Sequence, residues 1–275
     1  MEPLPRDYPV TGPPVLPPPG PGRPVAGFLL DLVLAIVLLL ALSLASGLAW
    51  AVFETLRLVV RGAAPDVAAL VRELGQPGAL PMIWMTLVST GGAALVVYFW
   101  RRRATPDERA LSHQAARRWR TWAWVLGTGV ATFLFSSAVS VLGDSLDIRP
   151  QPSNLALIEA AYAASPLFLT IFGVLLAPAY EELLFRRVLF GRLWASGRPW
   201  LGVLLSSAAF ALMHEIPGTT GNSGWATGML WLTYGFMGAA FALVYWRTRT
   251  LWAAIAAHAL NNAIALSVLN LYGSQ

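Results

Sequence analysis

The fold of this chain is decided by its long apolar runs, and the first of them, residues 26–53, reads AGFLLDLVLAIVLLLALSLASGLAWAVF. As a helix, a run of this length crosses the roughly 30 Å hydrocarbon core of a bilayer. It is too long for the apolar region of a cleavable signal peptide, so we expect a retained membrane anchor. Six further apolar runs follow, the fifth of the seven being short; they cover residues 79–100, 121–143, 166–195, 200–214, 224–246 and 251–272.

The composition agrees with a membrane protein. Of the 275 residues, 56% are hydrophobic and only 12% are charged, and a soluble domain could not bury so much apolar surface and stay dissolved. We therefore expect an all-α, polytopic transmembrane bundle of about seven to eight membrane helices. An ordinary cytosolic enzyme and a disulfide-stapled secreted domain are excluded. Because the chain has no cysteine, a thiolate metal site and a cysteine nucleophile are excluded as well.

The positive charge predicts an orientation in the membrane. All 19 basic residues are arginines, and the net charge is +5. If the N-terminus is inside, most of these arginines fall in inner segments or at inner ends of the apolar runs, with seven of them in residues 101–120. The positive-inside rule therefore predicts a cytoplasmic N-terminus and an outer C-terminus. We expect an integral membrane protein, located in a bacterial inner membrane. We interpret the charge as topological and expect the lipid bilayer, not nucleic acid, as its partner.

The chain divides into three parts. Residues 1–24 are rich in proline, which cannot continue a helix, so we predict a disordered Pro-rich tail. Residues 25–155 are predicted to hold the N-terminal transmembrane helices and their loops, with a surface helix in the charged segment 54–78. Residues 156–275 are predicted to form the catalytic membrane core, and a short interfacial helix is predicted at 153–165, where this core begins.

Ionisable residues within the apolar runs gather in three short clusters. Such residues are costly inside a bilayer and are by default candidates for function. The clusters read AYEELLFRR at residues 179–187, FALMH at 210–214 and HALNN at 258–262. Two of the three histidines lie in them. The third, His113, falls in the arginine-rich stretch and is expected to be solvated.

Helix geometry separates the two glutamates of the first cluster. Glu182 and Arg186 are four residues apart with the acid first, which is the favourable order for an ion pair on one helix face. Glu181 is rotated by about 100° from Glu182, so it stays outside that pair. We predict that Glu182 is structural and Glu181 is chemical, since the arginine neutralises only one of two adjacent carboxylates. Pro178 disfavours regular helix at Ala177 and predicts a local kink.

The other two clusters each present two side chains on one helix face. Phe210 and His214 are four residues apart, and so are His258 and Asn262. Hydrolysis of a peptide bond needs an activated water and a group that holds the oxyanion. We predict that Glu181 and His214 activate the water. We predict that His258 and Asn262 donate hydrogen bonds to the oxyanion.

Each cluster alone has a plainer explanation. Two glutamates followed by two arginines suit an interfacial anchor, and a single histidine in an apolar helix is more often a hydrogen-bonded core residue. The three clusters together are much harder to attribute to chance, because so few ionisable residues lie inside the apolar runs.

The clusters resemble, in the same order, the motifs E-E-x-x-x-R, F-x-x-x-H and H-x-x-x-N/D of the CPBP family of intramembrane proteases, also called the ABI or type II CAAX prenyl endopeptidase family. The resemblance covers roughly residues 160–272. It implies endopeptidase activity on a membrane-associated protein or peptide, with the first Glu and first His activating water, the last His and Asn holding the oxyanion, and the other motif residues as structural support. The matching residues are Glu181, Glu182, Arg186, Phe210, His214, His258 and Asn262.

The cofactor prediction keeps two alternatives, no metal or zinc. Members of the family are often labelled metalloproteases, and Glu181, His214 and His258 form a two-histidine, one-carboxylate set that suits zinc. The same residues suit a metal-free glutamate mechanism, which we favour. The pair His214-Glu215 does not begin an H-E-x-x-H site, because Gly218 stands where the second histidine is needed.

Two other functions compete with proteolysis. A transporter would also bury ionisable residues, but two similar halves with broken helices are expected there and are not evident in the sequence. A catalytically silent member that binds a partner, as in bacteriocin self-immunity, would tolerate loss of Glu181. The sequence leaves the substrate, its prenylation and the oligomeric state open.

Overall fold

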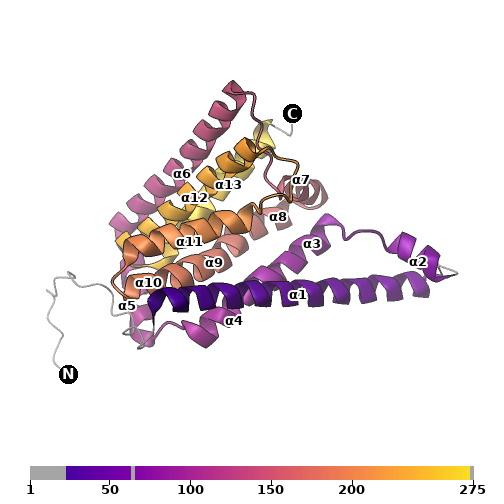
Figure 1. Ribbon diagram of the computed structural model, residues 1–275, viewed down its shortest axis with the longest axis horizontal. Helices are drawn as coiled ribbons and strands as arrows, with labels where there is room; N and C mark the ends of the chain where they lie inside the picture. Colours follow the sequence, from indigo (N-terminus) through magenta and orange to yellow (C-terminus); the bar gives the residue numbers. More distant parts are fainter. Residues whose placement is uncertain (1–22, 63–65, 273–275) are drawn as a thin grey trace.

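The computed structural model describes residues 23–62 and 66–272, and every regular element in these stretches is a helix (Figure 1). The predicted all-α fold is therefore confirmed. The predicted Pro-rich tail lies outside the described residues, apart from its last two positions, and Pro24 begins the first helix. Proline suits that position, because the first helical residue needs no backbone donor.

Sixteen helical elements, three of them short π-helical segments labelled η, make up the described chain. In order they are α1 (Pro24–Val60), α2 (Val67–Leu74), α3 (Ala79–Thr86), η1 (Leu87–Gly91), α4 (Gly92–Arg101), α5 (Pro106–Ala116), α6 (Trp119–Ser145), α7 (Leu155–Ala164), α8 (Pro166–Ile171), η2 (Phe172–Leu176), α9 (Ala177–Glu182), η3 (Leu183–Phe190), α10 (Gly191–Ala195), α11 (Pro199–His214), α12 (Gly224–Thr248) and α13 (Leu251–Tyr272).

Six helical runs of the described chain are long and apolar enough to cross a membrane. They are α1, the continuous run α3–η1–α4, α6, the continuous run α8–η2–α9–η3–α10, α12 and α13. Two shorter apolar helices, α7 and α11, accompany them. The predicted apolar runs therefore all form helices, the run at 200–214 is short as expected, and the segment 153–165 contains the predicted short helix α7.

The predicted surface helix at 54–78 is only partly correct. Its first residues continue α1 as far as Val60, because the sequence TLRLVV keeps the segment apolar despite Arg57. Only Val67–Leu74 forms a separate helix, capped at its start by the Asp66 side chain, which accepts a hydrogen bond from the Ala69 N–H at 2.8 Å. In Figure 1 the far half of α1 and the short α2 extend away from the other helices.

The main core lies where η3, α11, α12 and α13 pack together. Small residues let these helices approach closely: a Cβ atom on Gly238 of α12 would lie 2.9 Å from the Ser207 Cα atom of α11. A Cβ atom on Gly129 of α6 would lie 3.1 Å from the Ala257 carbonyl oxygen of α13. Close packing through small residues is typical of membrane helices, and here it draws the C-terminal helices into one tight unit.

The kink predicted at Pro178 takes a different form. Ala177 and Pro178 are both helical and begin α9, and the irregularity lies one turn earlier, in η2. Proline has no N–H for the carbonyl four residues before it, and the wider π turn accommodates that loss. A second π segment, η3, starts directly after Glu182. Irregular helix therefore brackets the Glu181–Glu182 pair on both sides, and π segments often occur at functional sites.

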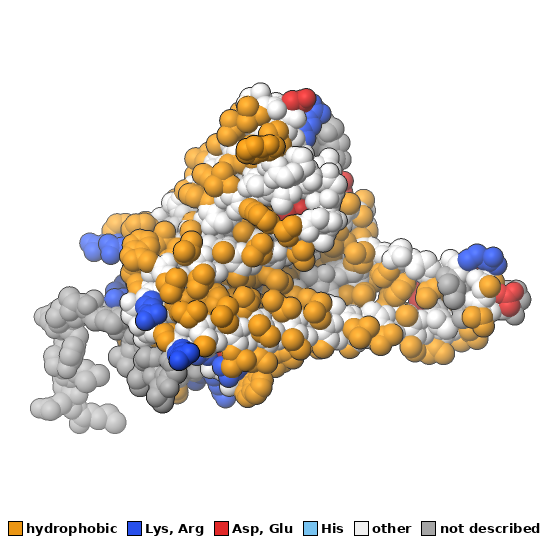
Figure 2. Space-filling view, in the orientation of Figure 1, with side chains coloured by type: hydrophobic (Ala, Val, Ile, Leu, Met, Phe, Trp, Pro, Cys, Tyr) orange, Lys and Arg blue, Asp and Glu red, His pale blue; other side chains and the backbone are white. Residues whose placement is uncertain are grey.

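One end of the molecule gathers basic and aromatic side chains. Here α1 begins, and α4 and α10 end; the α5 label stands at the same end (Figure 1). We call it the arginine-rich end and define it by Arg101, Arg102, Arg187 and Arg192. The outward faces of the helices are covered with apolar side chains (Figure 2), as expected for surfaces that face lipid.

Candidate active site

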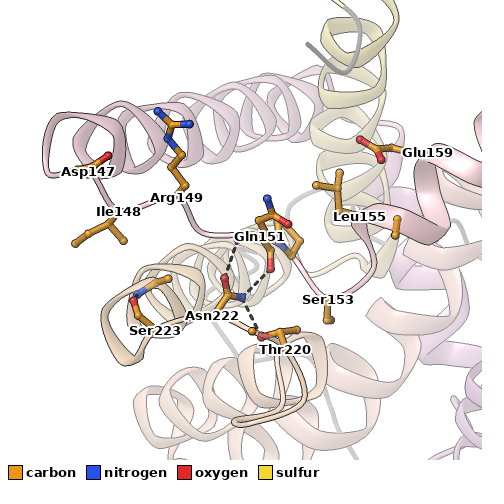
Figure 3. A pocket seen from close by; sticks show the side chains of 14 residues that line it. Asp147, Ile148, Arg149, Gln151, Ser153, Leu155, Glu159, Thr220, Asn222 and Ser223 are labelled. Atoms are coloured by element: carbon orange, nitrogen blue, oxygen red, sulfur yellow. Dashed lines mark hydrogen bonds between the residues drawn. The ribbon is translucent and has the colours of Figure 1, made fainter.

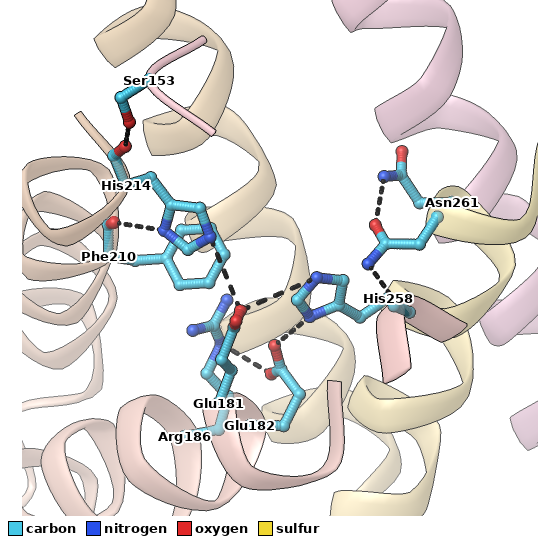
Figure 4. Close-up of polar contacts among 10 residues, drawn as sticks. Ser153, Glu181, Glu182, Arg186, Phe210, His214, His258 and Asn261 are labelled. Carbon is cyan, nitrogen blue, oxygen red and sulfur yellow. Dashed lines mark hydrogen bonds and ion pairs between the residues drawn. The ribbon is translucent and has the colours of Figure 1, made fainter. Parts of the chain in front are cut away.

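Three helices bring Glu181, His214 and His258 together. Glu181 lies in α9, His214 is the last residue of α11, and His258 lies within α13. The Glu181 Oε2 atom is 3.6 Å from His214 Nε2 and 3.9 Å from His258 Nε2 (Figure 4). The structure therefore brings together three of the four residues that the sequence predicts to act in hydrolysis.

Hydrogen bonds on the far side of each imidazole set its orientation. His214 Nδ1 lies 2.8 Å from the Phe210 carbonyl oxygen, and His258 Nδ1 lies 2.9 Å from Glu182 Oε1. A carbonyl and a carboxylate oxygen accept hydrogen bonds, so both Nδ1 atoms donate. Both Nε2 atoms are thereby turned towards Glu181. A donor at Nδ1 also means that a neutral imidazole presents a lone pair at Nε2.

The predicted ion pair of Glu182 and Arg186 is confirmed. Arg186 Nε lies 2.9 Å from Glu182 Oε2, and both side chains are fully buried. The other oxygen of Glu182 accepts from His258, so this carboxylate also holds the histidine in place. That second task was not predicted from the sequence. The Arg186 guanidinium lies 4.7 Å above the Phe210 ring centre and 5.5 Å above that of Phe241, and such cation–π contacts favour a buried cation.

Aromatic rings pack around the imidazoles. Phe210 is fully buried, and its ring centre lies 4.1 Å from that of His214. Phe241 stacks on His258 at 4.7 Å, and Tyr234 lies 4.7 Å from His214. The predicted supporting position of Phe210 agrees with these contacts. The two residues of α12 were missed, because that helix carries no ionisable cluster that could draw attention to it.

Asn262, predicted as an oxyanion donor, lies against a different element. Its Nδ2 atom donates to the Gly173 carbonyl of η2 at 2.8 Å, and its Oδ1 accepts from Asn261 at 3.1 Å. Among the described residues, none of the recorded contacts joins Asn262 to Glu181 or to either histidine of the cluster. The structure thus joins three of the four predicted catalytic residues directly and attaches the fourth to the π segment before Pro178. His113, as expected, is exposed.

Two side chains of the cluster are partly exposed, although the Glu181 Oε2 atom itself is buried. The side chains of Glu181 and His214 are 18% and 20% exposed, whereas that of His258 is 4% exposed. A cavity of about 540 Å³ lies nearby in the loops, and it does not include Glu181 (Figure 3). Its walls come from the segment after α6 and from the loop between α11 and α12. Asn222 of that loop joins the two walls, because its side chain accepts a hydrogen bond from the Gln151 N–H and donates one to the Gln151 carbonyl.

Glu215 was missed as a structural residue. This fully buried carboxylate accepts a hydrogen bond from the Ser153 N–H at 3.0 Å and another from the Thr220 hydroxyl at 3.0 Å. Ser153 also donates from its hydroxyl to the His214 carbonyl at 3.0 Å, where α11 ends and the carbonyl has no helical partner (Figure 4). Glu215 therefore joins two loops around the end of the helix that carries His214. The sequence signal for Glu215 is an acid directly beside the motif histidine His214.

A second ionic cluster, at the arginine-rich end, was also missed. Asp31 is fully buried in α1 and forms ion pairs with Arg101 Nε at 2.5 Å and Arg192 Nε at 2.6 Å. Nearby, Arg187 donates from Nη1 and Nη2 to the two carboxylate oxygens of Glu108, at 3.1 and 2.7 Å. The signal was present, because Asp31 is the one acid in the first apolar run.

The zinc alternative was tested against the donor geometry. Glu181, His214 and His258 are suitable ligand types, and the Nδ1 hydrogen bonds of both histidines resemble those that orient zinc ligands. Within the described chain, however, no group of three or more His, Asp or Glu side chains lies close enough to hold a metal ion. As arranged in this structure, the three side chains do not fit a metal site.

Comparison with known proteins supports a membrane peptidase. The model of the type II CAAX prenyl endopeptidase Rce1-like family matches residues 163–264, a stretch that contains all three motifs. The chain is also 27% identical over 175 residues to the Bacillus subtilis protein named "Putative membrane peptidase YdiL", which covers 63% of this chain and 67% of that protein. No solved structure matches the chain significantly. The resemblance inferred from the motifs is confirmed by the family match and the relative.

Proposed function

We propose that the chain is an intramembrane endopeptidase of the CPBP family whose water-activating pair is Glu181 and His214. The three motifs, the family-model match and the similar membrane peptidase support this proposal. The substrate is a membrane-associated protein or peptide. The observation that carries the proposal is the convergence of the Glu181 Oε2 atom with two Nε2 atoms at 3.6 and 3.9 Å.

The distances suit a water molecule bound between these groups. At 3.6 Å, Glu181 and His214 are too far apart for a good direct hydrogen bond, but both can contact one water. Because His214 donates through Nδ1 to the Phe210 carbonyl, its neutral Nε2 accepts a hydrogen bond from the water, and Glu181 accepts a second hydrogen bond from the same water. As the water oxygen attacks the scissile carbonyl carbon, Glu181 takes up the proton and later delivers it to the leaving amine.

His258 supplies the positive charge that an oxyanion needs. Its Nδ1 proton is used by Glu182, so a hydrogen bond from Nε2 to the oxyanion requires the doubly protonated imidazolium. With His258 in that form, the two glutamates are balanced by one imidazolium and by Arg186, and the buried group is neutral overall. The imidazolium then faces the site where negative charge develops during the attack. Asn262 assists through the amide hydrogen that Gly173 does not use.

The proposal is tested by comparing protein termini in membrane fractions of cells that express the wild type or Glu181→Gln. Glutamine keeps the size and contacts of the side chain but cannot take up the proton. The matched control is Glu73→Gln, which removes an exposed carboxylate on α2, far from the site. New termini that occur with the wild type and Glu73→Gln, and vanish with Glu181→Gln, support proteolysis. Identical termini in all three strains would refute it and favour a partner-binding protein.

Metal dependence is decided on the purified protein with the substrate so identified. For the metal-free mechanism, we expect exhaustive chelation to leave turnover unchanged and elemental analysis to find no stoichiometric zinc. Loss of activity on chelation, restored by added zinc with one zinc per chain, would instead make Glu181, His214 and His258 ligands.

A further inference from the structure

Arg102, at the arginine-rich end, has a guanidinium edge without a partner. It follows α4 directly, and its Nε and Nη2 atoms are buried without a hydrogen-bond partner in the described part of the chain. These two nitrogens carry the parallel N–H groups of one side of the guanidinium. That side is the fork with which arginine binds two oxygens of a carboxylate or phosphate at once.

The acids near Arg102 are already bound to other arginines. Asp31 is held between Arg101 and Arg192, and Glu108 is held by two nitrogens of Arg187. Arg187 also donates from Nε to the Arg102 carbonyl at 3.3 Å, which places the two residues side by side. The group therefore contains four arginines and two acids, so its net charge is +2 and two further negative charges would neutralise it.

Burial and the neighbouring cations disfavour the charged form of Arg102. Desolvation, followed by the charges of Arg192 and Arg187, lowers the pKa of Arg102 to about 10. Two buried guanidinium nitrogens without hydrogen-bond partners, beside other cations, are unfavourable unless an anion joins them. An anion at the fork would contribute both the missing hydrogen bonds and the missing charge.

The depth of Arg102 in the membrane indicates which kind of anion could reach its guanidinium. The membrane-spanning run Ala79–Arg101 ends one residue before it, and the preceding Trp100 is 70% exposed. Trp119, which begins the next spanning helix, is 74% exposed. Tryptophans mark the level of the lipid headgroups, and anionic headgroups at this level attract basic residues.

We propose that the Nε–Nη2 edge of Arg102 binds a phosphate group, supplied by the headgroup of an anionic phospholipid, next to Arg187 and Arg192. The phosphate oxygens accept the two unused hydrogen bonds. The bound lipid then joins α4, α5 and η3–α10 at the membrane surface. This site is separate from the proposed catalytic cluster, so the failure of either proposal leaves the other standing.

The test uses the full chain in nanodiscs and follows thermal unfolding by tryptophan fluorescence. The bilayers contain phosphatidylcholine alone, phosphatidylcholine with phosphatidylglycerol, or phosphatidylcholine with inorganic phosphate in the buffer. The variant is Arg102→Gln, and the matched control is Arg103→Gln, which removes an exposed guanidinium that lies 5.7 Å above the Phe99 ring. Native mass spectrometry counts the phosphatidylglycerol molecules that each protein retains.

We expect phosphatidylglycerol to raise the unfolding temperature of the wild type and of Arg103→Gln, but not of Arg102→Gln. In phosphatidylcholine alone, Arg102→Gln should unfold at or above the wild-type temperature, because it lacks the unpaired cation. Its apparent affinity for phosphatidylglycerol should fall about tenfold or more, the loss expected for charge-assisted hydrogen bonds. Arg102→Lys keeps the charge without the fork and should lose most of that affinity as well.

Two results would overturn the site. One is a wild type that responds to neither phosphatidylglycerol nor phosphate. The other is an equal loss of the response in Arg102→Gln and Arg103→Gln, which would mean general surface charge. If inorganic phosphate alone reproduces the full shift, the phosphate site stands and its source is free phosphate, so the lipid assignment is wrong.

Discussion

Asp31 and Glu181 are both acids within apolar helices, and they are satisfied very differently. Asp31 is fully buried, and each of its oxygens is paired with an arginine at 2.5 or 2.6 Å. The Glu181 side chain is 18% exposed, and its Oε2 atom has no hydrogen-bond partner among the described residues. The nearest cationic or basic atoms are the imidazole nitrogens at 3.6 and 3.9 Å.

The difference separates an acid that joins helices from one that is available for chemistry. A carboxylate with both oxygens bound to guanidinium groups is a poor base, because taking up a proton would break those contacts. A carboxylate oxygen that lies beside two imidazoles without a hydrogen-bond partner in the described chain can take up a proton without such a loss. Glu182 is bound to Arg186 and His258, so it is a structural acid like Asp31, although it is the direct neighbour of Glu181 in the sequence.

The largest effect is expected for Glu181→Gln. Its turnover should fall by about 10²- to 10⁴-fold, the contribution of a general acid–base group, while the unfolding temperature stays within a degree or two of the wild type or rises. No hydrogen bond to Glu181 Oε2 is lost in the described chain. Turnover is measured on the purified protein with the substrate found by the terminus comparison. A variant with wild-type turnover would place Glu181 in the same structural class as Asp31.

Arg186→Ala should give the largest loss of stability. It would leave the fully buried Glu182 without its guanidinium, at a cost of about 3–5 kcal/mol. Denaturant or thermal unfolding in detergent measures the loss. The control is the double variant Arg186→Ala with Glu182→Gln, which removes both charges and keeps an acceptor for His258. It should recover much of the stability. An Arg186→Ala protein as stable as the wild type would contradict the structural role of the pair.

A smaller loss of stability is expected for Asp31→Asn, about 2 kcal/mol, because its two arginines are partly exposed and can reach water. Turnover per folded molecule should be unchanged, in contrast to Glu181→Gln. Asp144→Asn, which alters an exposed acid of α6, is the matched control and should leave the unfolding temperature unchanged. A fall in turnover without a loss of stability in Asp31→Asn would remove the distinction between the two acids.

Local patterns in the sequence were enough to predict much of the fold and the centre of the site. The apolar runs mark the membrane helices, and the spacing of Glu182 and Arg186 predicts their ion pair, since both depend on residues close together in the chain. That Glu181 meets His214 and His258 could be inferred because ionisable residues are rare in the runs.

Contacts between distant segments could not be predicted in the same way. Asp31 pairs with arginines 70 and 161 positions away, and no spacing rule connects such positions. Asn262 shares a helix face with His258, yet its amide donates to η2, because the π turn before Pro178 presents the Gly173 carbonyl to α13. The form of that irregular helix is set by packing, which proline alone does not reveal.

The smallest effect is expected for Glu215→Gln, which tests whether an acid can serve the site without touching its chemistry. Glutamine keeps one accepting oxygen for Thr220 but weakens the hydrogen bond from the Ser153 N–H, which together with Ser153 Oγ fixes the end of α11. We expect kcat to fall about tenfold, which corresponds to about 1.4 kcal/mol, with KM nearly unchanged, because His214 is held less firmly.

The contrast between kcat and KM separates positioning from general destabilisation. The control for Glu215→Gln is Glu159→Gln, which alters an exposed acid that lines the loop cavity and should leave both constants unchanged. Ser153→Ala removes only the hydroxyl that caps the His214 carbonyl, so it should reproduce part of the fall in kcat. If Glu215→Gln loses stability but keeps the wild-type kcat, Glu215 is a loop anchor of the same kind as Asp31. A selective fall in kcat instead makes Glu215 a positioning residue for His214, with a role intermediate between those of Asp31 and Glu181.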